Sequence, residues 1–131
     1  MGERRTVSSE SEFEDIVGYS RAVRVGDFVA VSGTTAAAPG ATAVGGNDIA
    51  EQTREALRRI AAALAEAGAS LEDVVRTRVF VTDITRWPEV ARAHREIFGA
   101  IRPAASMYQV SALITPALLV EIEADAIIGG H

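Results

Sequence analysis

The sequence predicts an α+β fold in which two helices cover one face of a mixed β-sheet. Two segments carry apolar residues at helical spacing, and several shorter segments alternate apolar and polar residues as strands do. The predicted order is β-β-α-β-α-β-β, with a further strand expected at residues 4–7. Because 131 residues is close to the usual size of one domain, we expect a single domain over residues 1–131.

A hairpin is predicted near the N-terminus. Its strands span residues 19–24 and 28–32, and Val25-Gly26-Asp27 forms the turn between them. Gly26 suits this place, because glycine adopts positive φ at little cost. Residues 38–46 are mostly small, which predicts a loop after the hairpin.

The first long helix is predicted to begin after Asp48 and to end before Gly68. Asp48 is a favourable N-cap, Glu51 follows three residues later as in a capping box, and Gly68 suits a left-handed C-terminal cap. The apolar stripe of this helix comprises Leu57, Ile60, Ala61 and Leu64. We expect that stripe to face the sheet.

A strand at residues 74–82 and a second helix are predicted next. One side of the strand carries Val75, Thr77, Val79 and Val81, and the other carries Arg76, Arg78, Phe80 and Thr82. The helix begins near Trp87-Pro88 and ends at Gly99. Its apolar face comprises Trp87, Val90, Ala91, His94, Ile97 and Phe98. We interpret His94 as a core histidine with one hydrogen bond.

The last third of the chain predicts two strands, at residues 106–111 and 118–128. In the second strand Glu121, Glu123 and Asp125 share one side. Two helices can cover only one face of a sheet, so these acids and the arginines of the central strand would lie on the uncovered face. That face is either a solvated charged surface or an interface with paired charges, and we expect a homo-oligomer.

The composition argues against several classes of protein. The net charge is −5 and the basic residues are scattered arginines, which argues against nucleic acid as the main ligand. No apolar run approaches the roughly 20 residues of a membrane helix, so we expect no membrane partner and a cytoplasmic location. The chain has no cysteine and two separated histidines, so we expect no metal and no other cofactor.

Four segments together resemble the RidA/YjgF family, also called endoribonuclease L-PSP-like proteins. They are GYSRAVRVGD at residues 18–27 followed by VSG at 31–33, LEDVVRTRVFVTD at 71–83, RPAAS at 102–106 and VEIEA at 120–124. The resemblance covers about residues 16–128. It implies a chorismate-mutase-like fold and a homotrimer with central barrel-like sheet packing and three clefts between subunits. It also implies hydrolysis of enamines or imines, such as 2-aminoacrylate, to a keto acid and ammonia.

The resemblance assigns several residues to the cleft. Tyr19 matches a tyrosine that reaches the cleft, and Ser32 and Gly33 match a turn whose backbone lines it. Glu121 matches the acid that positions a water, and a carboxylate in a partly buried cleft could act as a general base on that water. An alternative role for Glu121 is a cross-strand partner of Arg76 or Arg78.

The chain departs from the family pattern at one central position. Ala105 stands where deaminating members carry the arginine that binds the substrate carboxylate, and a methyl group cannot replace a bidentate guanidinium. Ser106 follows it, and Met107 stands where members often carry a cysteine. Arg21 and Arg102 are candidates to replace the missing arginine, and the alternative for each is a solvated surface arginine.

These observations leave four functions open. The first is a trimeric family member whose clefts bind a small molecule, as a divergent deaminase or hydrolase of a C=N or related substrate. The second is a working enamine or imine deaminase in which another arginine stands in. The third is an activity on nucleic acid, against which the acidic composition argues. The fourth is a non-catalytic trimer that binds a ligand or a protein.

Overall fold

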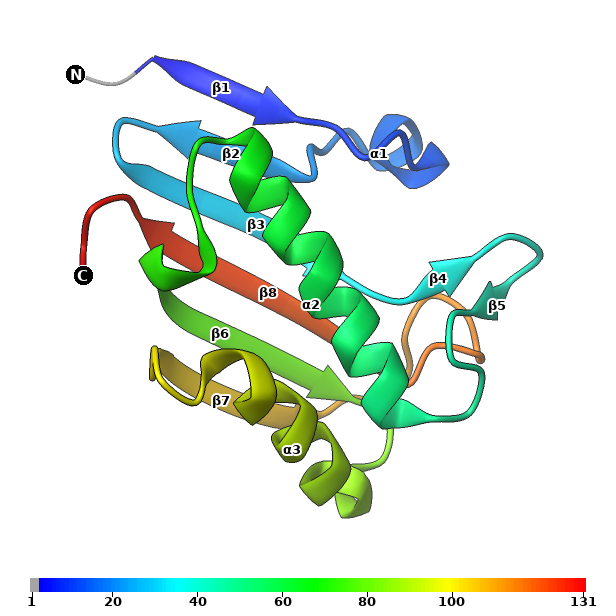
Figure 1. Cartoon of the computed structure of the whole chain (residues 1–131). Helices are drawn as coiled ribbons and strands as arrows, with labels where there is room; N and C mark the ends of the chain where they lie inside the picture. Colours follow the sequence, from blue (N-terminus) through cyan, green and yellow to red (C-terminus); the bar gives the residue numbers. More distant parts are fainter. Residues whose placement is uncertain (1–2) are drawn as a thin grey trace.

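A mixed six-stranded sheet with two long helices on one face forms the body of the molecule (Figure 1). The computed structural model describes residues 3–131. The strands of this sheet are β1 (Arg4–Val7), β2 (Ala22–Val25), β3 (Phe28–Thr34), β6 (Val74–Val81), β7 (Ala104–Gln109) and β8 (Val120–Ile127). The helices are α1 (Glu12–Val17), α2 (Ile49–Glu66) and α3 (Trp87–Phe98), with 3₁₀ turns η1 (Leu71–Asp73) and η2 (Ile84–Arg86). This architecture confirms the predicted fold class.

The strand order in the sheet is β1-β2-β3-β8-β6-β7. Neighbouring strands are antiparallel, apart from β6 and β7, which are parallel. A parallel neighbour requires a crossover, and α3 supplies it between β6 and β7. The C-terminal strand β8 thereby lies in the middle of the sheet, between the hairpin strand β3 and β6 (Figure 1).

The core lies between the sheet and the two long helices. From α2 it contains Leu57, Ile60, Ala63 and Leu64, and from α3 it contains Val90 and Phe98. The sheet contributes alternate residues of β8, namely Val120, Ile122, Ala124 and Ala126, which are fully buried. The acidic residues between them are left on the opposite face, as the alternation predicts.

The predicted ends of α2 are confirmed in position. The Asp48 carboxylate accepts a hydrogen bond from the Glu51 backbone N–H at 3.1 Å, which satisfies one free donor of the first turn. The Glu51 side chain forms an ion pair with Arg54 at 2.6 Å. Gly68 has a φ of +85°, the left-handed conformation expected of a residue just after a helix.

Several segments differ from the predictions, among them β7, which spans Ala104–Gln109 where a strand at residues 106–111 was expected. Helix α1, which was not predicted, forms after Ser11, whose hydroxyl accepts a hydrogen bond from the Phe13 N–H. The first hairpin strand begins at Ala22 and not at residue 19. The predicted loop at residues 38–46 contains part of a small hairpin, β4 (Ala37–Ala38) and β5 (Thr42–Ala43).

Two side chains predicted to face the core are exposed. The pairing of β6 with β8 shifts between Val74 and Arg76, so Val74 takes the core position and Val75 is 38% exposed. Trp87 is the first residue of α3 and is 55% exposed. Within residues 3–131, no helix is long and apolar enough to cross a bilayer.

Candidate functional site

The uncovered face of the sheet carries a ladder of opposite charges. Arg78 of β6 lies 3.1 Å from an Asp125 oxygen and 3.6 Å from a Glu123 oxygen of the neighbouring strand β8. The predicted cross-strand pairing is therefore confirmed for Arg78. Glu121 lies opposite Phe80 in the strand register and forms no ion pair within the described residues, so its alternative role as the partner of Arg76 or Arg78 is wrong.

Glu121 is a half-buried carboxylate that rests directly against the backbone of Gly33. A Cβ at position 33 would overlap the Glu121 carboxylate, so only glycine admits this contact. Burial raises the pKa of Glu121, the nearby Glu123 charge raises it further, and Arg21 opposes both. The environment thus brings the titration of this carboxyl toward neutral pH, which suits a group that exchanges protons.

Arg21 is fixed against the end of β3. Its Nη1 donates to the carbonyl oxygens of Ser32 (3.3 Å) and Gly33 (2.6 Å) and to the Thr34 hydroxyl (2.9 Å). Its guanidinium also lies 5.6 Å from the centre of the Tyr19 ring. These contacts hold Arg21 and Tyr19 beside Gly33 and Glu121.

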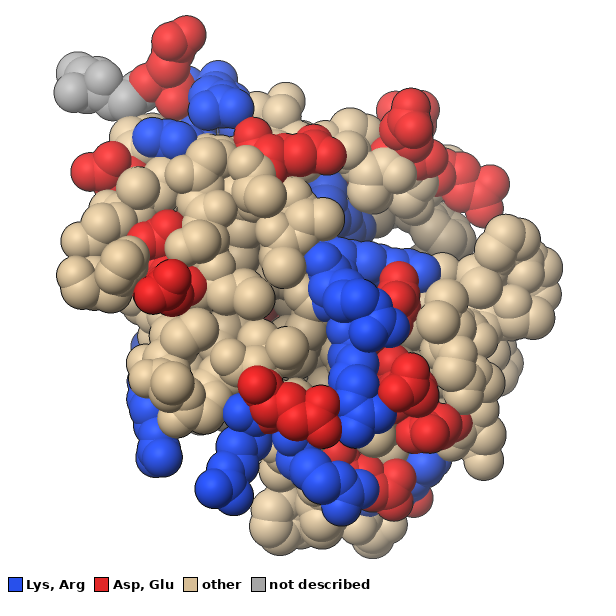
Figure 2. Space-filling view, in the orientation of Figure 1, with Lys and Arg blue, Asp and Glu red and all other residues tan. Residues whose placement is uncertain are grey.

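A groove of about 810 Å³ collects these residues. Tyr19, Arg21, Gly33 and Glu121 all line it, and the groove continues along α2 and the segment before α1. Figure 2 shows a hollow between the regions of α1 and the β4–β5 hairpin. The structure thus brings together four of the predicted site residues. The Ser32 hydroxyl donates to the Ser20 carbonyl (2.6 Å) and does not line the groove.

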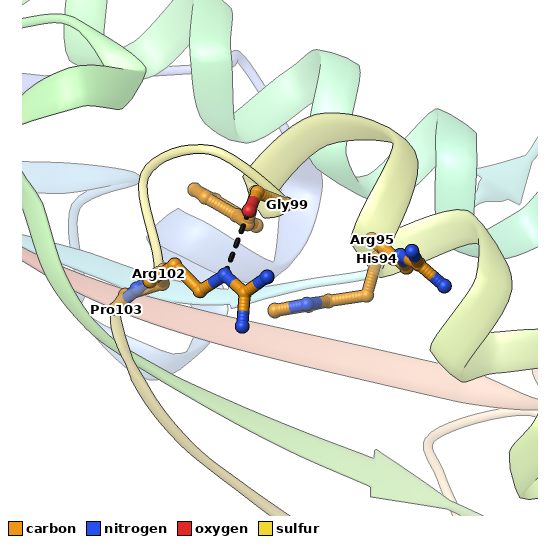
Figure 3. Close-up of a pocket in the computed structure, with 6 residues that line it drawn as sticks. His94, Arg95, Gly99, Arg102 and Pro103 are labelled. Carbon is orange, nitrogen blue, oxygen red and sulfur yellow. Dashed lines mark hydrogen bonds between the residues drawn. The ribbon is translucent and has the colours of Figure 1, made fainter.

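A second pocket, of about 400 Å³, lies at the C-terminal end of α3. His94, Arg95, Phe98, Gly99, Arg102 and Pro103 line it. Figure 3 shows Arg102 reaching back under the helix end, where its Nε donates to the Gly99 carbonyl at 2.8 Å. Its two η nitrogens have no hydrogen-bond partner within residues 3–131. Arg102 also adopts a φ of +59°, which is unusual for a residue other than glycine.

His94 is a half-buried residue on the wall of the second pocket. Its Nε2 lies 2.9 Å from the hydroxyl of the fully buried Thr77, and burial lowers the pKa of the imidazole. The expected single hydrogen bond of His94 is therefore confirmed, but the residue lies on a pocket wall and not in the core. Its ring also packs on Phe98, with centroids 4.8 Å apart.

The predicted residues of β7 divide between the two faces of the sheet. Ala105 and Met107 pair in register with Thr77 and Val79, so they lie on the side of the sheet that α3 covers. Ser106 pairs with Arg78 and lies on the uncovered face. Within one chain, Ala105 and Arg102 are therefore near the second pocket, whereas Glu121 lies in the groove.

Thr34, Thr35 and Arg59 line the groove, and the sequence did not indicate them. Arg59 reaches the groove from α2. In the sequence it lies among polar residues, as a solvated surface arginine would. Thr34 and Thr35 come there because the register of β3 against β8 shifts between Val31 and Thr34. No sequence pattern predicts that register shift. Within residues 3–131, no group of three or more histidine or acidic side chains could hold a metal ion.

Comparison with known proteins identifies clear relatives. The sequence profile of the family described as Endoribonuclease L-PSP matches residues 9–128. A RutC family protein of Pyrococcus abyssi is 35% identical over 123 residues, which is 94% of this chain and 96% of the relative. The human 2-iminobutanoate/2-iminopropanoate deaminase is 32% identical over 126 residues, which is 96% of this chain and 91% of the human protein.

A solved structure resembles this one closely. Rv2704 of Mycobacterium tuberculosis, a member of the YjgF/YER057c/UK114 family, superposes with a TM-score of 0.88 at 60% sequence identity. The match covers 96% of this chain and all of the other.

Proposed function

The chain belongs to the endoribonuclease L-PSP family, which includes the RidA/YjgF and RutC proteins, and from its site we propose that it hydrolyses the C=N bond of a small molecule with Glu121 as general base. The observation that supports this most is the placement of Glu121. Its carboxylate is half-buried, rests on Gly33, has a raised pKa and has no ion-pair partner within the described residues. Such a carboxylate is free to accept a proton from water.

The proposed reaction needs no group beyond water and the substrate. As the water oxygen adds to the carbon of the C=N bond, one water proton passes to the Glu121 carboxylate. Glu121 returns this proton to the imine nitrogen, and the product of this step is a carbinolamine. Its C–N bond then breaks, a C=O bond forms, and the hydroxyl proton leaves with the nitrogen as ammonia. Glu121 acts as base in the first half of the reaction and as acid when it returns the proton.

We also propose that the working form is a homotrimer with clefts between subunits. Two features support this. The face of the sheet with the Arg78 ladder has no helix over it. The groove with Glu121 and the pocket beside Ala105 lie on different parts of one chain, and a neighbouring copy could join them into one cleft.

The substrate class follows from which arginine is free. Ala105 cannot bind a carboxylate, so a substrate without an α-carboxylate is the first choice. A second candidate is an imino acid of the kind named for the human relative, with Arg102 in place of the missing arginine. The free η nitrogens of Arg102 favour it, because a guanidinium fork binds a carboxylate through two parallel hydrogen bonds. Arg21 is the weaker candidate, since its Nη1 is already bonded to three oxygens.

The test is hydrolysis of imines generated in situ by an amino-acid oxidase and an amine oxidase, which supply substrates with and without a carboxylate. Release of ammonia would be measured for the wild type, Glu121→Gln, Arg102→Gln and Ala105→Arg. We expect Glu121→Gln to lower kcat by about 10²-fold or more on whichever imine is used.

The other variants separate the two substrate classes. Activity on the amine-derived imine, with a gain on the imino acid in Ala105→Arg, supports a substrate without a carboxylate. Activity on the imino acid that falls in Arg102→Gln supports the second candidate. If neither imine is hydrolysed faster than in buffer, the proposed function is wrong and a non-catalytic trimer is favoured. If the wild type is active and Glu121→Gln retains full activity, the proposed role of Glu121 as general base is wrong.

A further inference from the structure

Two arginines hold the backbone of residues 32–37 from two directions. Arg21, just before β2, donates to the carbonyl oxygens of Ser32 and Gly33. Arg59, from α2, donates through Nη1 to the Thr35 carbonyl and through Nη2 to the Ala37 carbonyl, both at 2.9 Å. Four carbonyl groups of one short segment are thus bound by two guanidinium groups.

This segment comprises the end of β3, where the strand departs from regular pairing, and the residues that lead into β4. The register shift between Val31 and Thr34 interrupts the ladder with β8, and interrupted pairing leaves backbone groups that need other partners. Each guanidinium is in turn fixed. The Nε of Arg59 donates to Glu55 at 2.8 Å, and Arg21 also contacts the Thr34 hydroxyl and the Tyr19 ring.

The segment matters because Glu121 rests on it. The Glu121 carboxylate touches Gly33 so closely that a methyl group would not fit between them. A displacement of the Gly33 backbone must therefore displace the carboxylate or leave a gap beneath it. Thr34 and Thr35, which line the same groove, would move with it.

We propose that Arg21 and Arg59 are positioning residues that clamp the backbone of residues 32–37 and, through Gly33, set the place of the Glu121 carboxylate. This inference deepens the proposed function, on which it rests only for its effect on catalysis. Neither arginine is required to touch the substrate. The planar guanidinium fork is essential to the contact of Arg59, whose two η nitrogens reach two carbonyls, because an ammonium group offers no fixed fork.

The experiment is a ¹³C NMR titration of the glutamate side-chain carboxyls between pH 4 and 8, together with backbone amide spectra. The variants are Arg21→Lys and Arg59→Lys, which keep the charge and lose the fork. The Glu121 signal is assigned by its absence in Glu121→Gln. The matched control is Arg24→Lys, because Arg24 also bonds two backbone carbonyls, those of Gly26 and Ala67, away from Glu121.

Arg59→Lys is the decisive variant, since no contact joins Arg59 to Glu121. We expect it to shift the amide signal of Gly33 and the titration midpoint of Glu121, whereas Arg24→Lys shifts neither. Arg21→Lys should have the same effect as Arg59→Lys, because it keeps the charge and loses the planar group that the Tyr19 ring and hydroxyl hold in place. If Arg59→Lys changes only residues 35–37, the clamp does not reach Glu121 and the proposal is wrong.

Two further measurements test the proposal independently of the titration. If the lysine variants do not fold, ¹⁵N relaxation of the wild type tests the proposal. Residues 32–37 should be as ordered as β8 if the arginines clamp them, whereas mobility like that of the β4–β5 tip would contradict the clamp. Where C=N hydrolysis is measurable, Arg59→Lys should lower kcat about tenfold with KM within about twofold. The NMR measurements do not require catalytic activity. An inactive wild type would therefore refute the proposed function, whereas the clamp would still be tested by the NMR shifts.

Discussion

At the scale of single residues, Glu121 and Gly33 form the chemically distinctive contact. Because Gly33 has no side chain, the Glu121 carboxylate approaches its backbone closely and is partly shielded from water. The charge of Glu123, on the same strand, repels it. Arg21 offsets part of this cost. Residues that bear such costs are common at functional sites, because a shifted pKa is useful for proton transfer.

The raised pKa of Glu121 predicts a pH-dependent effect on stability. The folded protein keeps this carboxyl protonated to higher pH than the unfolded chain does. The stabilisation from the neutral form is therefore complete below the unfolded pKa and is lost as the pH rises through the folded one. Glu121→Gln stays neutral at every pH, so we expect it to exceed the wild type in stability at pH 8 and not at pH 4.

Urea denaturation at both pH values measures this difference. Glu72→Gln, at an exposed glutamate of η1, is the matched control. If the free energy of unfolding of the wild type increased relative to that of Glu121→Gln as the pH rises, the environment assigned to Glu121 would be contradicted.

At the scale of elements, Gln52 joins α2 to the loop directly before it and to a segment that is remote in sequence. It is fully buried on α2, and its Nε2 donates to the carbonyls of Gly46 (2.7 Å) and Ala117 (2.9 Å). Its Oε1 accepts from the Leu119 N–H at 2.9 Å. One side chain thus ties α2 to the loop before it and to the segment that enters β8.

Gln52→Leu is predicted to destabilise the protein by roughly 2–4 kcal/mol. The leucine has a similar volume, but it leaves three partly buried backbone groups, those of Gly46, Ala117 and Leu119, without this partner, at about 1–3 kcal/mol for each group that water cannot reach. The free energy of unfolding from urea titration measures the effect.

Arg58→Leu, on the exposed side of the same helix, is the control, and we expect a change within about 0.5 kcal/mol. Equal losses in the two variants would show that the bonds of Gln52 contribute nothing specific.

At the scale of the whole molecule, the uncovered sheet face is the surface on which the proposed trimer depends. Arg78 lies there between Glu123 and Asp125. Along α2, in contrast, the arginines visible in Figure 2 alternate with acidic residues, and Arg54, Arg58 and Arg59 each pair with a glutamate. On that helix surface each of these arginines lies beside a glutamate, so the opposite charges partly offset one another.

The proposed trimer predicts a mass of about 41 kDa in analytical ultracentrifugation, three times the chain mass of 13.8 kDa. Arg78→Glu should reduce it toward the single-chain mass, because it places a third acid between Glu123 and Asp125 on the proposed interface. Arg92→Glu, on the exposed side of α3, should leave the mass unchanged. A wild type that sediments as a single chain would refute the trimer.

The amino-acid sequence by itself determined the fold class and the ends of α2, because periodicity and capping are local properties of a chain. It also indicated the alternation of β8 and the resemblance that pointed to Tyr19, Gly33 and Glu121. It missed α1, whose six residues are too short for a periodic signal. It also placed Val75 in the core, because one extra residue in a strand reverses every side chain before it.

Only the tertiary structure decided which arginine is free and which is bound. Arg21, Arg59 and Arg102 look alike in the sequence, yet two of them bind backbone carbonyls at the end of β3 and in the segment after it, and the third keeps its η nitrogens unpaired within residues 3–131. The reason is physical: a hydrogen bond to a distant carbonyl depends on where strands shift register and where a helix crosses them. Those are properties of long-range packing, and no local pattern of residues encodes them.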